Sequence, residues 1–219
     1  IPAYNAEATI AGAIGSVLGQ TVPASAIYVV DDGSTDRTAE QAAAAGRLVT
    51  VIRKENGGPG SATTAGLRAA TTDYVATLDS DDIWLPQKME RQIACLEADP
   101  GVAAVFSLAK VFPDGAEANP DLYQQVVRLW TRTTMVYRKT AAGEIGEMRD
   151  FPGYLGDFVD WLGRGRDLGH RHQMVEEVLA MRRRRSGSLS DTGGSDRVRG
   201  YLQVAREAIE RRKRMEQGS

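Results

Sequence analysis

Residues 74–82 read Tyr74-Val75-Ala76-Thr77-Leu78-Asp79-Ser80-Asp81-Asp82, an apolar run that stops in three carboxylates. A short half-apolar run of this kind predicts a strand that enters a core. The acids then lie where the strand leaves the sheet, which is the edge where open α/β sheets bind ligands. Neighbouring carboxylates repel one another unless a cation or hydrogen-bond donors lie among them, and Mg²⁺ or Mn²⁺ suits such a group. The alternative for a lone Asp-x-Asp is an acidic turn that caps the next helix.

Two more loops follow predicted strands. The strand 26–30 ends in Asp31-Asp32-Gly33-Ser34, and the strand 48–52 leads to the glycine-rich loop 55–60 and a helix capped by Ser61. Strands that alternate with helices predict a largely parallel sheet with crossover helices, so the three loops meet at one edge. Carboxylates, the N–H groups of a glycine-rich loop and a helix N-terminus together suit the metal-bound diphosphate of a nucleotide.

The remaining elements are less regular. Helices are expected at about 7–20, after Thr35-Asp36, along the stripe from Leu85 to Leu96, at 155–163 and after a polar loop at 186–195, and strands at 102–111, 130–137 and 175–181. The last helix carries Val198, Tyr201, Leu202, Ala205 and Ile209 at helical spacing, which predicts that this face docks on the body.

Composition limits the class of protein. A chain of 219 residues suits one α/β domain, and a net charge of −2 gives no general attraction to nucleic acid, so no nucleic-acid partner is expected. The single Cys95 excludes an internal disulfide and fits a cytoplasmic location. We find neither a transmembrane stretch nor a signal peptide. The chain opens at Ile1-Pro2 without Met, as though a strand had been cut, so we expect missing upstream residues.

Several enzyme classes are disfavoured by what the motifs lack. The glycine-rich loop has no Gly-Lys-Ser/Thr, which disfavours a P-loop NTPase, and it lacks the dinucleotide fingerprint. No Gly-x-Ser-x-Gly elbow points to a hydrolase. His170 and His172 fall in a polar stretch beside arginines, where solvated side chains are expected.

Four ordered motifs carry a family resemblance. They are residues 2–7 (Pro-Ala-Tyr-Asn-Ala-Glu), 30–36 (Val-Asp-Asp-Gly-Ser-Thr-Asp), 56–59 (Asn-Gly-Gly-Pro) and 79–88 (Asp-Ser-Asp-Asp-Ile-Trp-Leu-Pro-Gln-Lys). In this order they resemble the family 2 inverting glycosyltransferases of GT-A fold. The resemblance implies an α/β fold of the GT-A nucleotide-diphospho-sugar transferase type, a Rossmann-like mixed sheet with helices on both faces. Residues 1–112 would form the nucleotide-sugar-binding half, and residues 113–219 the acceptor-side half and C-terminal helix of the same domain.

The resemblance also assigns roles to residues. Those assigned to the nucleotide are Pro2, Tyr4, Asn5, Glu7, Asp31, Asp32, Asn56, Gly57, Gly58, Asp79 and Ser80. Asp79 and Asp81 form the Asp-x-Asp motif that would hold a Mn²⁺ or Mg²⁺ ion on the diphosphate. Such a cation would stabilise the charge of the leaving nucleoside diphosphate. Trp84 would lie on the acceptor side or pack the start of the next helix.

Inversion requires a general base for the acceptor hydroxyl. The family places it in a Glu-Asp pair on a helix, whereas this chain reads Gly156-Asp157-Phe158-Val159-Asp160-Trp161. Asp157 takes the Glu position and Phe158 the usual base position. We therefore expect Asp157 to be the base, with Asp160 as the second candidate.

The run Arg182 to Arg185 is a second departure, because many members of the family carry a histidine near its end. Arginine cannot ligate a metal, so we expect Arg183 or Arg185 to neutralise the diphosphate directly. The competing interpretation is a solvated or membrane-facing charge run, which would allow peripheral contact of the C-terminal arginines with the inner face of a membrane.

The sequence favours a metal-dependent inverting transferase that moves a sugar from a nucleoside-diphosphate sugar, with UDP as the expected nucleotide, to an acceptor hydroxyl. The acceptor, whether a glycan, a lipid or a small molecule, stays open. One alternative is a degenerate nucleotide-sugar-binding module, indicated by Phe158, Thr63, Thr64 and Arg185. Another is a nucleotidyltransferase, which would need a basic loop near the N-terminus.

Overall fold

The computed structural model describes residues 1–185 and 195–217, so most of the predicted polar loop 186–195 lies outside the described part. A small parallel sheet has the order β1-β2-β3, from β1 (Pro2–Ala3), β2 (Ile27–Asp31) and β3 (Val49–Arg53). The larger sheet has the order β4-β8-β6-β9-β5. Its strands are β4 (Tyr74–Ala76), β5 (Ile83–Trp84), β6 (Val102–Pro113), β8 (Val136–Arg138) and β9 (Arg171–Arg184), with β7 (Val126–Val127) paired to β6.

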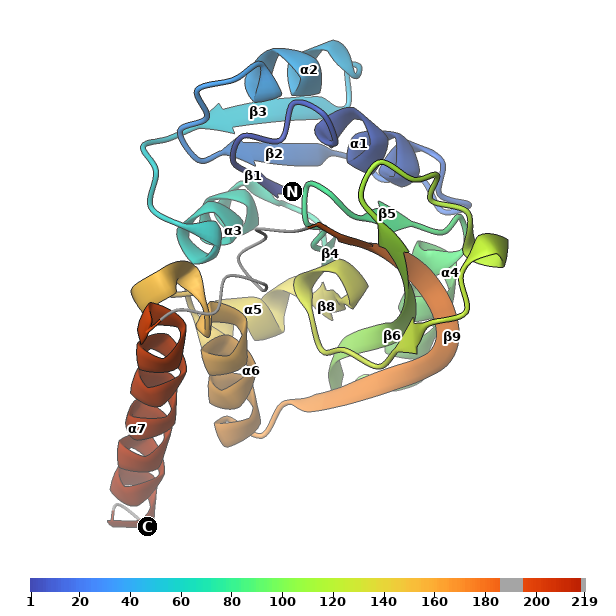
Figure 1. Ribbon diagram of the computed structural model, residues 1–219. Coiled ribbons are helices and arrows are strands. Elements are labelled where there is room, and N and C mark those ends of the chain that lie inside the picture. Colours follow the sequence, from blue (N-terminus) through green and yellow to red (C-terminus); the bar gives the residue numbers. More distant parts are fainter. Residues whose placement is uncertain (186–194, 218–219) are drawn as a thin grey trace.

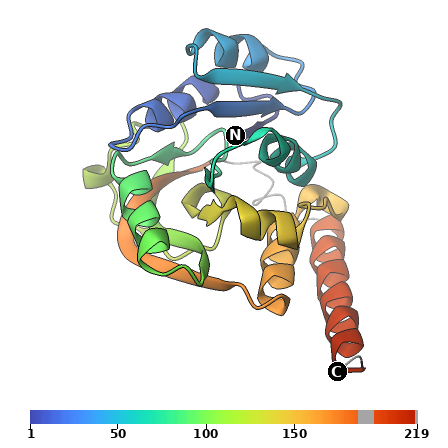
Figure 2. The ribbon, with the colours of Figure 1, turned by 180° about the vertical axis from the view of Figure 1, so that it is seen from behind.

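Helices cover both faces of the small sheet, as predicted. Successive residues of a strand point to opposite faces. Val29 of β2 belongs to the core cluster that contains Ile10 and Ile14 of α1 (Ile10–Leu18) and a residue of α2 (Thr38–Ala44). Its neighbour Val30 faces Gly66 of α3 (Pro59–Ala69) on the other side. The two views in Figures 1 and 2 show α3 between this sheet and the rest of the chain.

The expectation of a largely parallel sheet is wrong for the larger sheet. β8 pairs antiparallel with both β4 and β6, β5 pairs antiparallel with β9, and only β6 and β9 run parallel. The predicted strand 130–137 is also shorter than expected. Residues Arg132–Thr134 form a 3₁₀ turn, and Trp130 packs its ring on Phe106 at 4.6 Å between ring centroids. The apolar alternation there reflects side-chain packing of a turn and not a strand ladder.

Several helix boundaries differ from the sequence prediction. α3 begins at Pro59 behind Gly58, whose φ of 99° favours glycine, so Ser61 lies in the first turn and is not the cap. α4 (Lys88–Ala98) and α6 (Asp157–Asp167) were expected, but α5 (Lys139–Ile145) was not. Among the described residues, no helix is both long and apolar enough to cross a bilayer.

A cavity of about 590 Å³ lies between the two sheets. Residues of β2, α3 and β4 line it, including Tyr28, Gly66 and Val75. β1 pairs with β2 over only two residues, and β4 pairs with β8 alone. The two sheets therefore share no strand pairing, and the cavity lies along the boundary between them.

The last helix docks through a different face from the one predicted. α7 (Ser195–Gln217) contacts the 3₁₀ turn η3 (Pro152–Tyr154) and α6. The buried residues at this contact are Gly200 and Val204, whereas Val198, Leu202 and Ile209 are each more than half exposed. The apolar stripe that the sequence marked as a docking face therefore points away from the body. Figure 1 shows α7 beside α6 with its C-terminal half extending past the rest of the molecule.

We predict that Gly200→Ala destabilises the protein by about 1–3 kcal/mol. A Cβ at this position would lie 2.5 Å from the carbonyl oxygen of Pro152 and 2.7 Å from that of Leu155, so η3 or α7 must move. Urea unfolding measures the effect. The matched control is Gly143→Ala in α5, where no atom lies within 4 Å, and this change should stabilise by about 0.5–1 kcal/mol. Equal effects of the two changes would contradict the docking contact.

Candidate functional site

The acids that follow β4 form a cluster with two accessible members and one buried one. The side chains of Asp79 and Asp81 are 35% and 19% exposed, and Asp82 is 3% exposed. Asp82 accepts hydrogen bonds from the hydroxyl of Thr133 and from the backbone N–H of Arg183 at 2.8 Å. Asp82 therefore anchors the loop to β9, and Asp79 and Asp81 are left to face the site.

One arginine joins this cluster to the expected base. The Nε of Arg132 donates to Asp79 at 3.1 Å, and its Nη1 donates to Asp157 at the start of α6. The side chain of Arg132 is 15% exposed and that of Asp157 is 5% exposed. The planar guanidinium thus holds two carboxylates from distant parts of the sequence in one site. No sequence motif marked Arg132, because its position depends on the 3₁₀ turn that precedes β8.

The pKa values in the cluster follow from burial and like charge. Burial raises the pKa of Asp81, the charge of Asp79 adds to this, and Arg185 partly opposes it. Burial raises the pKa of Asp82 well above its usual range, with further contributions from Asp79 and Asp81. Burial lowers the pKa of Arg132, but the two carboxylates more than offset this, so the net shift is upward. Arg132 and Arg185 already pair with Asp79 and Asp81, so the repulsion between the like charges of the cluster is partly offset.

Arg183 and Arg185 both point toward the acids, so this part of the run is not a solvated surface. Arg183 donates through Nε to the carbonyl oxygen of Asp81 at 2.9 Å, pairs with Asp114 at 3.3 Å and lies over the ring of Phe112. Arg185 pairs with the carboxylate of Asp81 at 3.2 Å and is 38% exposed. Arg183 is therefore committed to the loop, whereas Arg185 is the more accessible cation.

The loop after β2 uses its carboxylates within the protein. Asp31 is fully buried and accepts from the N–H of Ser34 and from Arg53, both near 3 Å. Asp32 accepts from Lys54 at 2.6 Å and from the backbone N–H groups of Gly57 and Gly58 at 3.1 and 2.8 Å. The glycine-rich loop thus wraps a carboxylate of its own chain, which the sequence analysis did not foresee.

The N-terminus of α3 is also occupied by a side chain. Asp150 accepts from the backbone N–H groups of Gly60 at 2.8 Å and Ser61 at 2.6 Å. Burial raises the pKa of Asp150, these two hydrogen bonds oppose the rise, and the charges of Asp157 and Asp32 add to it. The expected diphosphate site at this helix end therefore already holds an anion. Asp150 carried no motif in the sequence, because only the fold brings it to α3.

The other residues assigned to the nucleotide lie mostly on accessible surface. Tyr4 is 50% exposed, and Asn5 accepts from the backbone N–H of Thr35. Pro2 lies in β1, Glu7 accepts from the N–H of Arg37, Asn56 meets the hydroxyl of Tyr154 at 3.5 Å, and Ser80 is half-buried. Because β1, β2 and β3 run parallel, Tyr4, Asp32 and Lys54 follow their strands at the same sheet edge.

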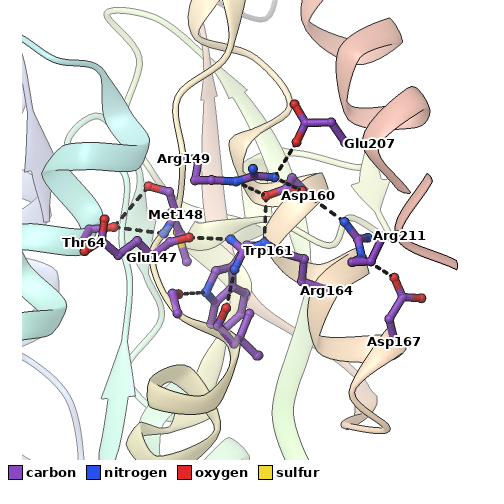
Figure 3. A network of polar contacts seen from close by, with 12 residues as sticks. Thr64, Glu147, Met148, Arg149, Asp160, Trp161, Arg164, Asp167, Glu207 and Arg211 are labelled. Atoms are coloured by element: carbon purple, nitrogen blue, oxygen red, sulfur yellow. Dashed lines mark hydrogen bonds and ion pairs between the residues drawn. The ribbon is translucent and has the colours of Figure 1, made fainter. Parts of the chain in front are cut away.

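The two candidate bases on α6 lie in different networks. Asp160 is 1% exposed and pairs with Arg149, Arg164 and Arg211, as Figure 3 shows. Arg149 also pairs with Glu207 of α7, so this network fastens α7 to α6. Asp157 shares the partner Arg132 with Asp79 of the Asp-x-Asp motif, and among the described residues Asp160 has no such shared partner. The geometry favours Asp157 over Asp160.

Of the two roles predicted for Trp84, the structure favours packing at the start of the next helix over the acceptor side. Its ring is 5% exposed, its Nε1 donates to the carbonyl oxygen of Thr133 at 2.8 Å, and Lys88 lies over it. Trp84 therefore packs the core at the start of α4. The histidines are not solvated either, because His170 pairs with Glu144, the nitrogens of His172 are buried, and its ring lies near those of Phe106 and Trp130.

Comparison with known proteins identifies the family. The model of "Glycosyl transferase family 2" matches residues 1–149, which is more than half of the chain. The chain belongs to this family. The acid cluster, the loop after β2 and the loop before α3 all lie inside the matched range.

Individual glycosyltransferases agree with this assignment. The amylovoran biosynthesis glycosyltransferase AmsE of Erwinia amylovora is 28% identical over 222 residues, covering 94% of this chain and 83% of AmsE. WfgD of Escherichia coli, a UDP-Glc:alpha-D-GlcNAc-diphosphoundecaprenol beta-1,3-glucosyltransferase, is 37% identical over 98 residues, covering 44% of this chain and 39% of WfgD. The chain spans about a third of the length of other family members from Rickettsia and Nostoc.

A solved structure shows the same fold. The mannosyltransferase PcManGT from Pyrobaculum calidifontis, in complex with GDP-Man and Mn²⁺, has a TM-score of 0.72 at 19% identity, covering 95% of this chain and 62% of that one. The GT-A fold expected from the motifs is confirmed. The division at residue 112 stays a prediction.

The fit of a divalent cation to this family 2 site is partial. Within residues 1–185 and 195–217, no three His, Cys, Asp or Glu side chains gather as a ready metal site. Asp79 and Asp81 offer two carboxylates, which is the usual protein share when phosphate oxygens complete the shell of Mg²⁺. Asp81 is 19% exposed and already pairs with Arg185 at 3.2 Å, so a cation would share this carboxylate with the arginine. The residues therefore fit a cation that arrives with a diphosphate.

We predict that Arg132→Met costs about 3 kcal/mol of stability, because it leaves the buried carboxylate of Asp157 unpaired. Urea unfolding of Arg128→Met provides the control. Arg128 pairs with Glu176 on the surface, where both side chains are more than half exposed, so its loss should cost less than about 1 kcal/mol. A similar cost for both variants would show that the Arg132 bridge adds no stability.

We also predict an acid-sensitive contribution from His172. Burial, followed by the charges of Arg166 and His170, lowers its pKa from 6.5 to about 4. The unfolded chain then binds a proton before the folded chain does, so stability falls as the pH drops from about 6.5 to about 4. Stability curves of His172→Phe should lose this part of the pH dependence, and those of His170→Gln should retain it. Parallel curves for wild type and His172→Phe would contradict the assignment.

Proposed function

We propose that the chain is a metal-dependent inverting glycosyltransferase that moves a sugar from a nucleoside-diphosphate sugar to an acceptor hydroxyl. The observation that carries the proposal is the bridge Asp79–Arg132–Asp157, because it joins the diphosphate candidates to a base candidate in one site. Membership of glycosyl transferase family 2 supports the reaction class. The Mn²⁺ and GDP-Man in the structure of PcManGT support a nucleotide-sugar donor held with a cation.

The roles of the residues follow from their surroundings. Asp81 and Asp79 would hold Mn²⁺ or Mg²⁺ together with the diphosphate, and the cation would supply Lewis-acid stabilisation of the leaving group. Arg185 is positioned to neutralise the same phosphates, because it reaches Asp81 and is still partly exposed. Arg183 holds the loop through the carbonyl oxygen of Asp81.

Asp157 would accept the proton of the acceptor hydroxyl. That oxygen then attacks the anomeric carbon on the face opposite the diphosphate, and the glycosidic bond to the diphosphate breaks with inversion. Arg132 contacts Asp157 through one carboxylate oxygen and keeps the side chain oriented toward the Asp-x-Asp motif. Asp160 is assigned a structural role, since three arginines surround it.

The proposal also covers the nucleotide of the sugar donor and the chemical nature of the acceptor. WfgD uses UDP-Glc and PcManGT was solved with GDP-Man, so relatives support both nucleotides, and we retain UDP as the expected one. AmsE takes part in amylovoran biosynthesis, and WfgD acts on a GlcNAc unit carried by a lipid diphosphate. We infer that the acceptor is a sugar hydroxyl of a growing, lipid-linked glycan.

A binding module without turnover is the second candidate. Hydrogen bonds within the protein favour it. The backbone N–H groups of the glycine-rich loop already donate to Asp32, and those at the start of α3 donate to Asp150. A diphosphate would find fewer free N–H groups here than the motifs suggest. Metal-dependent binding of a nucleotide sugar without hydrolysis or transfer would support the module and contradict the enzyme.

Calorimetry with UDP and GDP, with and without Mn²⁺, and a transfer assay test the proposal. Asp157→Asn should lower the transfer rate by at least about 100-fold and leave donor affinity unchanged. Arg185→Ala should weaken donor binding by about tenfold. Arg184→Ala, a change at the exposed residue that precedes Arg185 and ends β9, serves as the matched control. The proposal fails if Asp157→Asn retains full transfer activity, and the role of Arg185 fails if both arginine variants bind alike.

A further inference from the structure

The exposed face of α7 carries an apolar stripe. Val198, Leu202 and Ile209 are 59%, 52% and 56% exposed, and with Ala205 they recur at intervals of four, three and four residues. This spacing places them on one side of the helix. Gly200 and Val204 lie on the opposite side, against η3, so the stripe has no partner among the described residues of this chain.

Basic side chains flank the stripe. On a helix with 3.6 residues per turn, Arg206 and Lys213 fall on one flank and Arg212 on the other. The exposed Glu216 follows Ile209 by two turns, so the apolar part of the stripe ends at Ile209. The helix as a whole carries seven Lys or Arg against four Asp or Glu. Arg206 and Lys213 are exposed, and Arg212 is 61% exposed although it pairs with Asp167. An apolar stripe between basic flanks is the pattern of a helix that lies in the plane of an anionic membrane surface.

We propose that α7 lies on anionic lipid through this stripe, defined as Val198, Leu202, Ala205 and Ile209 with Arg206, Arg212 and Lys213 as its flanks. Figure 1 shows the C-terminal half of α7 extending beyond the body. α7 contacts η3 and α6, and ion pairs of Arg211 with Asp160 and Asp167 join it to α6.

The flanking charges distinguish lipid from two other partners of the stripe, a second copy of α7 and nucleic acid. In a pair of α7 helices, the basic flanks of two copies would meet and repel, whereas anionic head groups attract them. Nucleic acid would satisfy the arginines but would offer nothing apolar to Leu202 and Ile209. Lipid is the occupant that matches both the stripe and its flanks.

Vesicle co-sedimentation of the full chain tests the proposal and needs no sugar nucleotide, so it is independent of the proposed enzyme activity. The vesicles contain phosphatidylcholine alone or with about 30% phosphatidylglycerol. The chain should partition onto the anionic vesicles at least about tenfold more strongly, and less so at high salt. Equal partition onto both kinds of vesicle, or none, overturns the proposal.

Variants separate the two parts of the surface. Leu202→Gln with Ile209→Gln should lower partition onto anionic vesicles by at least about tenfold, and Arg206→Gln with Lys213→Gln by several-fold. The control is Leu122→Gln in η1 (Pro120–Leu122), which is 61% exposed and belongs to another part of the chain. Thermal melting confirms that the variants fold. The proposal is overturned if the variant Leu202→Gln with Ile209→Gln partitions onto anionic vesicles as strongly as the wild type. It is also overturned if light scattering shows that the wild type is a dimer and that this variant is a monomer.

Discussion

The guanidinium of Arg132 is the contact on which the arrangement of the site depends. Asp79 follows β4 and Asp157 begins α6, and these elements come from opposite halves of the chain. Two carboxylates this close would repel each other without a shared cation. Arg132 supplies that cation from the turn before β8, the strand that pairs with both β4 and β6. The pairing of β8 therefore sets the geometry of the acids as much as the acids themselves do.

A second constraint is the supply of hydrogen-bond donors near the diphosphate candidates. Asp32 takes two N–H groups of the glycine-rich loop and Asp150 takes two at the start of α3. These contacts make the loops rigid, but they remove donors that a phosphate could use. Under the proposed function, Arg185 and a bound cation would supply the positive charge for the diphosphate.

The network around Asp160 links the site to the periphery. Arg149, Arg164 and Arg211 converge on this one carboxylate, and Arg211 belongs to α7. Asp157 lies three residues earlier on the same helix, so the docking of α7 and the position of Asp157 share one element. A surface that holds α7 would thereby also hold the orientation of α6 relative to the acid cluster.

The sequence by itself determined the family, the fold type and the Asp-x-Asp motif, because these are local patterns in consecutive residues. The tertiary structure decided which residues face one another. It placed Arg132 between Asp79 and Asp157, buried Trp84, and turned the apolar stripe of α7 outward. The physical reason is that periodicity shows that a helix has an apolar face but not which partner covers it. At α7 the small Gly200 allows close approach to η3, and that contact outweighs the larger apolar side chains.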